Sequence, residues 1–179
     1  SADIADTFAG RMAAHRDSIL NGLDMVVRSL SEAAVCALCT DIHRYSRVAV
    51  FGILKSEAAA LVMQSEMAAL GKNVFTVVSH VQQREWLRTA GPEDLILLLS
   101  YRGIYFDYLQ GDDLEKLLAR PRVWLITGSR TTPPPGVDAV LRFASDLTQE
   151  HHPHQIAFVC STVVREYARL YGLPPRKTP

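Results

Sequence analysis

The sequence predicts an α/β fold with a parallel sheet, and two observations carry this prediction. Short apolar segments alternate along the chain with longer segments of helical periodicity. One short segment, Leu95–Leu99, is continuously apolar, as is typical of a central parallel strand covered on both faces. Such an alternation requires crossover helices, which lie on both faces of the sheet.

The chain begins with a helical region. Residues 4–44 contain few helix breakers and carry apolar residues every three or four positions. Ser31 has the position of an N-cap, so we expect a break near Leu30 and a second helix after it. We expect residues 1–32 to form a linker or dimerisation helix, residues 33–172 to form the main domain and residues 173–179 to be a tail.

Five strands and four further helices follow. The expected strands are Arg47–Phe51, Val74–Val78, Leu95–Leu99, Val123–Ile126 and Ala139–Phe143. The expected helices are Ser56–Leu70 (stopped by Gly71), His80–Leu87, Phe106–Ala119 (interrupted or delayed by residues 111–113), and one from Pro153 or His154 to about Tyr171. The prediction is a three-layer αβα sandwich with a five-stranded parallel flavodoxin-like sheet in the order 2-1-3-4-5.

Composition limits the classes of partner. The 19 basic and 19 acidic residues give a formal net charge of +0 and are scattered, so we do not expect this chain itself to bind nucleic acid. No apolar run reaches the ~18 residues of a membrane span, and the first residues do not resemble a signal peptide. We expect a cytoplasmic protein without membrane contact. Because the sequence does not begin with Met, we also expect processing or a longer parent protein.

The three cysteines do not indicate redox or zinc chemistry. Cys36 and Cys39 form a CxxC pattern, but in an alanine-rich helical segment rather than at a strand-to-helix turn. A zinc framework would need a second pair, and the third cysteine, Cys160, stands alone. We expect reduced cysteines buried in helices.

The loops after the first and third expected strands are candidate binding elements. In a sheet of this order they face a common crevice. Ser56 and Ser100 offer hydroxyls, and Lys55 and Arg102 offer positive charge, so a small phosphorylated ligand is favoured. Ser56 is also suited to be an N-cap, and Ser100 a turn residue. Gly52 alone does not provide the glycine fingerprint of a dinucleotide site or a P-loop.

Two stretches resemble motifs of the sugar isomerase (SIS) domain family. FGILKS at residues 51–56, with a helix ending at Leu70 and Gly71, resembles the first motif, roughly G-x-G-x-S and then L-x-x-L-G. DLILLLSYRGIY at residues 94–105 resembles the second, roughly D-x-x-x-x-x-S-x-S-G-x-T, and residues 123–127 resemble the strand that follows. The resemblance covers about residues 33–172.

Three residues depart from these motifs. Leu54 stands in place of the second glycine of the first motif. Arg102 and Tyr105 stand in place of a Ser and a Thr of the second. Arg102 either pairs with a phosphate or carboxylate or fills the pocket.

The arrangement of helices before the first strand is similar to the ligand-binding half of RpiR-type transcriptional regulators, in which a helix-turn-helix domain precedes the SIS domain. The resemblance implies a phosphosugar-sensing homodimer or higher homo-oligomer without enzymatic activity, which contacts DNA only through that separate domain. It implies no catalytic residue, cofactor or metal. The implied ligand-binding residues are Gly52, Lys55, Ser56, Ser100, Tyr101, Arg102, Gly103 and Tyr105.

Two other functions stay open, a sugar-phosphate isomerase and a ligand-free dimerisation scaffold. An isomerase needs an acid/base pair, for which Glu57 and one of His151, His152 or His154 are the candidates. The alternative for Glu57 is to complement the helix dipole. The three histidines are too close in sequence to favour a shared metal ion. One of them is instead a candidate to reach a ligand pocket across a dimer interface.

Overall fold

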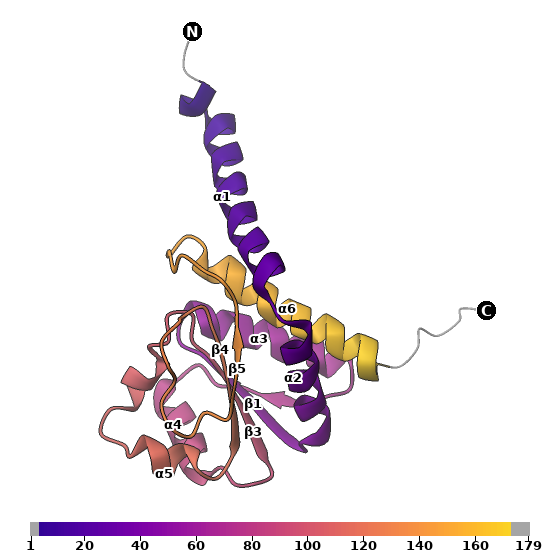
Figure 1. Cartoon of the computed structure of the whole chain (residues 1–179), viewed down its shortest axis with the longest axis vertical. Helices are drawn as coiled ribbons and strands as arrows, with labels where there is room; N and C mark the ends of the chain where they lie inside the picture. Colours follow the sequence, from indigo (N-terminus) through magenta and orange to yellow (C-terminus); the bar gives the residue numbers. More distant parts are fainter. Residues whose placement is uncertain (1–3, 173–179) are drawn as a thin grey trace, which may run out of the picture.

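The computed structural model describes residues 4–172, which form a five-stranded sheet between two layers of helices (Figure 1). The strands are β1 (Arg47–Phe51), β2 (Val74–Phe75), β3 (Asp94–Leu99), β4 (Arg122–Thr127) and β5 (Ala139–Arg142). They are all parallel and lie in the order β2-β1-β3-β4-β5. The predicted αβα architecture and strand order are confirmed.

Alternate side chains of the strands enter two separate cores. In β3 every residue is buried, with Leu95, Leu97 and Leu99 in one core. Ile96 and Leu98 lie in the other. Each buried Leu or Ile contributes about 1.5–3 kcal/mol, so the continuous apolar run of β3 is a main source of stability.

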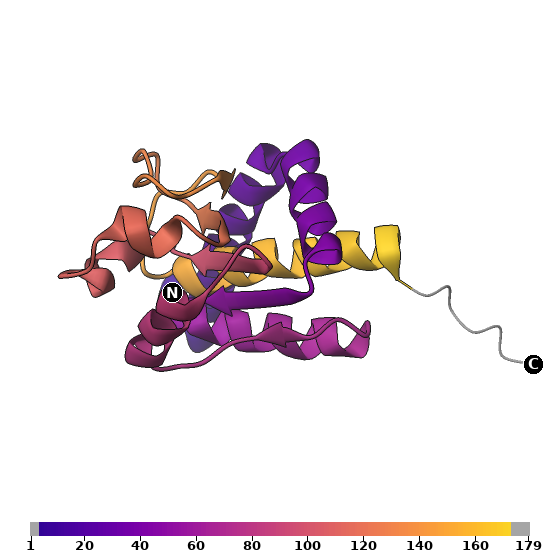
Figure 2. The same ribbon diagram turned by 90° about the horizontal axis from the view of Figure 1, so that it is seen from below.

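Helices cover both faces of the sheet. α2 (Glu32–Arg44), α3 (Lys55–Ala69) and α6 (His152–Tyr171) cover the first, and in Figure 2 α6 runs between α2 and α3. The second face is covered by α4 (His80–Thr89), the 3-10 helix η2 (Tyr105–Leu109) and the short α5 (Leu114–Leu118).

The N-terminal helices begin and end close to the predicted residues. After the 3-10 turn η1 (Ile4–Asp6), α1 (Phe8–Ser29) projects from the body (Figure 1). The C-terminal part of α1 contacts α6. The break falls at Leu30, and the Ser31 hydroxyl accepts a hydrogen bond from the Ala34 N–H at 3.2 Å. The predicted N-cap is therefore confirmed. The boundary at residue 32 stays a prediction, and residues 173–179 lie outside the described residues.

Two predicted elements are shorter in the structure. β2 contains only Val74 and Phe75 of the five expected residues, because this edge strand pairs with β1 alone and its chain then turns toward α4. The helix expected over residues 106–119 is split into η2 and α5. Gly111 lies between them at φ +92°, a conformation that ends a helix, and the Asp113 carboxylate caps α5 by accepting from the Lys116 N–H.

The cysteines are free thiols in the structure. Cys39 and Cys160 are buried, and Cys36 is half-buried. Burial raises the pKa of both buried thiols to about 12, so they are protonated at neutral pH. Within residues 4–172, no helix has the length and apolar character needed to cross a membrane, and no cluster of three or more side chains is arranged to hold a metal ion.

Candidate ligand-binding site

A pocket of about 200 Å³ opens at the carboxyl ends of β1 and β3, where the two candidate loops meet. Side chains from three segments line it: the loop after β1, the loop after β3, and the start of α6. The lining residues are Ile53, Leu54, Lys55, Ser56, Leu99, Ser100, Tyr101, Arg102, Ile104, Tyr105, Tyr108, Gln149 and His152.

The loop after β1 makes a tight turn into α3. The Ser56 N–H donates to the Ile53 carbonyl at 3.2 Å, and Leu54 takes φ 56° and ψ −113°. A Cβ on Gly52 would lie 2.7 Å from the Ser56 Cβ, so glycine permits the helix start to approach the strand end. Gly52 therefore shapes this loop and does not line the pocket.

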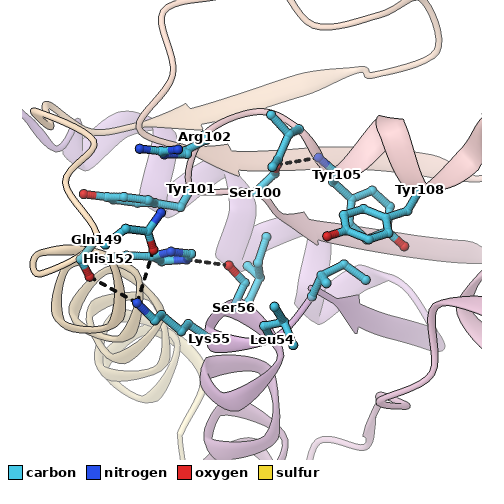
Figure 3. A pocket seen from close by; sticks show the side chains of 13 residues that line it. Leu54, Lys55, Ser56, Ser100, Tyr101, Arg102, Tyr105, Tyr108, Gln149 and His152 are labelled. Carbon is cyan, nitrogen blue, oxygen red and sulfur yellow. Dashed lines mark hydrogen bonds between the residues drawn. The ribbon is translucent and has the colours of Figure 1, made fainter.

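Ser56 faces the pocket and is not an N-cap. α3 begins at Lys55, and no side chain caps it. The Ser56 hydroxyl instead lies 3.1 Å from Nε2 of His152, at the start of α6 (Figure 3). The capping alternative for Ser56 is thus wrong, since its hydroxyl connects the start of α3 with the start of α6.

The loop after β3 is held by Ser100. Its hydroxyl accepts from the Tyr105 N–H at 2.9 Å, and its carbonyl accepts from the Gly103 N–H at 3.1 Å. Ser100 is therefore a turn residue that also lines the pocket. Gly103 lies against Ser129 outside the pocket, so it supports the loop without facing a ligand there.

The hydroxyl of Tyr101 points into the protein. It lies 3.0 Å from Oε1 of Gln155, 3.1 Å from the Thr148 carbonyl and 2.8 Å from the Ser145 hydroxyl. Burial raises the pKa of Tyr101. Its single O–H donor is already used, so Tyr101 contributes a ring face to the pocket.

Tyr105 is engaged in the same way. Its hydroxyl donates to Oε1 of Gln83 at 2.8 Å. Burial raises the pKa of Tyr105, and the nearby Glu57 carboxylate adds to that shift. Tyr105, which stands in place of the threonine of the family motif, therefore lines the pocket with its ring and provides no free hydroxyl to a ligand.

Two exposed cations stand at the pocket. Lys55 Nζ donates to the carbonyl and to Oε1 of Gln149, both at 3.2 Å, and Arg102 Nη2 donates to the Leu147 carbonyl at 3.2 Å. Neither side chain pairs with an acidic residue among those described. Their charge is thus available to an anion.

His152 lies between these cations. Its ring stacks on Tyr101 with centroids 4.2 Å apart and planes 12° apart. Burial, with smaller effects of Lys55 and Arg102, lowers the pKa of His152 from 6.5 to about 4. At neutral pH it is therefore an uncharged hydrogen-bonding group. The sequence contains one indication that His152 lies at the pocket. It follows β5, and this parallel strand ends at the same edge of the sheet as β1 and β3.

The other acid/base candidates lie elsewhere. Glu57 is buried and accepts from the Thr76 hydroxyl at 2.9 Å and from the Gly52 N–H at 3.4 Å, and burial raises its pKa. His151 contacts Asp146 and Ser18. None of the described residues that line the pocket is a carboxylate.

His154 is also outside the pocket. Its ring lies 6.5 Å from that of His15 on α1, between centroids. Of the three neighbouring histidines, only His152 faces the pocket.

The depressed pKa of His152 predicts an acid-sensitive stability. Between pH 6.5 and about 4 the unfolded chain binds a proton at this residue and the folded chain does not, so the free energy of unfolding falls as the pH falls through this window. The decrease is at most about 1.4 kcal/mol per pH unit. Urea unfolding at several pH values should show a smaller decrease for His152→Gln, and parallel curves for the two proteins would contradict this assignment.

Comparisons with known proteins agree at the level of the fold. No protein-family model matches the chain, and no curated protein matches its sequence. Among solved structures, the sugar isomerase domain of an RpiR transcription factor from Sphaerobacter thermophilus matches with a TM-score of 0.69 and 20% identity, over 88% of this chain and 89% of that one. The chain has the fold of an SIS domain.

Both regulators and enzymes share this SIS fold. Vibrio vulnificus NanR, in complex with ManNAc-6P, matches with a TM-score of 0.76 and 12% identity over 96% of this chain. This chain spans 64% of the NanR chain. A phosphoheptose isomerase from Francisella tularensis matches with a TM-score of 0.67 and 12% identity, over 91% of this chain and 99% of that one. The SIS fold alone therefore does not separate a sensor from an isomerase.

Proposed function

We propose that this SIS domain senses a phosphorylated sugar as the effector-binding part of an RpiR-like transcriptional regulator. The observation that carries the proposal is the pair of cations, Lys55 and Arg102, which face a serine-lined pocket without acidic partners. Lys55 and Ser56 also begin α3, whose N-terminal end attracts a phosphate. The two serine hydroxyls are positioned to meet phosphate or sugar oxygens.

The chemistry of the pocket favours a sensor over an isomerase. Moving a proton between adjacent sugar carbons needs a base and an acid within hydrogen-bond reach. The described lining contains no carboxylate, Glu57 lies elsewhere, and the low pKa of His152 makes it a weak base. The NanR and RpiR structures support the regulatory role, whereas the phosphoheptose isomerase keeps the enzyme as the second candidate.

Three further parts of the proposal rest on the resemblance to RpiR-type regulators. We propose that the protein is a homodimer or higher homo-oligomer, that it is cytoplasmic, and that it contacts DNA only through a separate helix-turn-helix domain.

The cations give the proposal a direct test. Arg102→Ala and Lys55→Ala should each weaken the binding of ManNAc-6P or mannose 6-phosphate about tenfold, because each removes a charge-assisted hydrogen bond to phosphate. Isothermal titration calorimetry measures this loss. The melting temperature should stay close to that of the wild type, since both side chains are exposed and donate only to neutral groups.

Lys116→Ala is the matched control. This lysine is 87% exposed on α5. The affinity of the Lys116→Ala protein for sugar phosphates should equal that of the wild type. No binding of any sugar phosphate would favour the scaffold instead. Interconversion of aldose and ketose phosphates, followed by NMR, would favour the isomerase.

A further inference from the structure

The pocket has two chemically different ends. Figure 3 shows Lys55, His152 and Arg102 on one side of the two serines, and Tyr105 and Tyr108 on the other. The lining also contains the aliphatic side chains of Ile53, Leu54, Leu99 and Ile104. Sugar hydroxyls against such a wall lose their water without gaining hydrogen bonds, so a sugar phosphate alone leaves this end unmatched.

Leu54 is held in a strained conformation at this end. Its φ of 56° and ψ of −113° are typical of glycine, which the family motif has at this position. The turn is fixed by the hydrogen bond from the Ser56 N–H to the Ile53 carbonyl. A non-glycine residue in such a turn is unfavourable for folding, and strain of this kind is concentrated at binding sites.

Within residues 4–172, the Leu54 side chain gains little packing to offset this strain. The Leu54 side chain is 81% exposed, so its apolar surface stays in water. Ile104, from the other loop, is 50% exposed at the same pocket. Two aliphatic side chains from separate loops thus lie at the pocket with much of their surface uncovered. An apolar group of a ligand would cover it.

One polar atom is also available at this end. The Tyr108 hydroxyl makes no hydrogen bond to another described residue. An acylamino group fits this arrangement, because its methyl group can cover Leu54 and Ile104 while its amide carbonyl accepts a hydrogen bond from the Tyr108 hydroxyl. The volume of about 200 Å³ limits such a substituent to a small group.

We propose that the pocket selects sugar phosphates that carry a small acylamino substituent, and that Leu54 determines this selectivity. The inference rests on the proposed function, since it assigns the phosphate to the cationic end. Lys55 and Arg102 hold the phosphate, and the aliphatic end distinguishes the acylated sugar from the plain one.

The test compares matched ligands on Leu54 variants. Wild-type protein should bind ManNAc-6P more tightly than mannose 6-phosphate. Leu54→Gly should reduce the affinity for ManNAc-6P about tenfold and leave that for mannose 6-phosphate unchanged. It should also raise the melting temperature by about 3 °C, because glycine relieves the strain. Leu54→Ala keeps the strain and removes the contact, so it should lose the selectivity without gaining stability.

Leu20→Ala is the control, since this residue is 49% exposed on α1. It should change neither the affinities for the two ligands nor the melting temperature. Equal affinity of the wild type for both ligands, or an equal effect of Leu54→Gly on both, overturns the selectivity and leaves the sensor intact. Failure of both ligands to bind the wild type overturns the proposed function as well. A loss of self-association in Leu54→Gly, by analytical ultracentrifugation and without a selective ligand effect, assigns the residue to a second copy of the chain and overturns the inference.

Discussion

Replacing Gln155 with leucine should lower the free energy of unfolding by about 3 kcal/mol. Gln155 is fully buried, and its Nε2 donates to the Gly22 carbonyl at 2.8 Å and to the Ala144 carbonyl at 3.3 Å. Its Oε1 accepts from the hydroxyls of Tyr101 at 3.0 Å and Ser145 at 2.6 Å. Leucine has a similar volume, so the loss comes from buried polar groups left without partners and not from a cavity.

Urea unfolding of both proteins measures this difference. Gln82→Leu on α4 is the matched control, because Gln82 is exposed, and its effect should stay within about 0.5 kcal/mol. Equal stabilities of the Gln155 and Gln82 variants would show that the network contributes nothing. The Gln155 variant should also bind sugar phosphates less tightly, since Tyr101 carries the ring on which His152 stacks.

Asp41→Leu should have the second-largest effect, a loss of about 2 kcal/mol. The Asp41 carboxylate on α2 accepts from the Trp124 indole N–H at 2.8 Å and from Arg122 Nε at 2.5 Å. Trp124 is only 3% exposed, so its N–H would stay buried without a partner. Arg122 is more exposed and can be solvated, and it adds less to the loss.

Thermal unfolding followed by tryptophan fluorescence, to which Trp86 and Trp124 both contribute, measures the effect of Asp41→Leu on stability. Asp41→Asn keeps an acceptor for the indole and should retain more of the stability than Asp41→Leu. Asp24→Leu, at an exposed position of α1, should stay within about 0.5 kcal/mol of the wild type. An Asp41→Leu variant as stable as the Asp24 control would contradict the importance of this contact.

The sheet could be predicted because its strands carry strong local signals. The apolar run at Leu95–Leu99 needs burial on both faces, and the alternation with helices then determines the parallel order. The length of β2 could not be predicted in this way. Val77 and Val78 have high strand propensity, but their chain leaves the sheet, where an edge strand has one neighbour only.

The location of the site could be predicted from the sequence, but the roles of its individual side chains could be predicted only in part. Six of the eight candidate residues line the pocket, and only Gly52 and Gly103 do not; their binding of a ligand stays a prediction. The tyrosines lie there with their hydroxyls turned away, because Gln155 and Gln83 are buried acceptors on distant segments. His152 was named only as one of three histidines that could serve as acid or base or reach a pocket across a dimer interface, since the two motifs do not extend to α6. It lies instead in the pocket of its own chain.

The projecting helix α1 has a mechanical consequence. Its carbonyl at Gly22 is held by the buried amide of Gln155, and Phe8 begins the helix 14 residues earlier, about 21 Å away along the axis. A tilt of about 10° at Gly22 would therefore displace Phe8 by about 4 Å. The helix acts as a lever that Gln155, Ser18 and Ser29 hold at its base, so a small tilt there becomes a large displacement at Phe8.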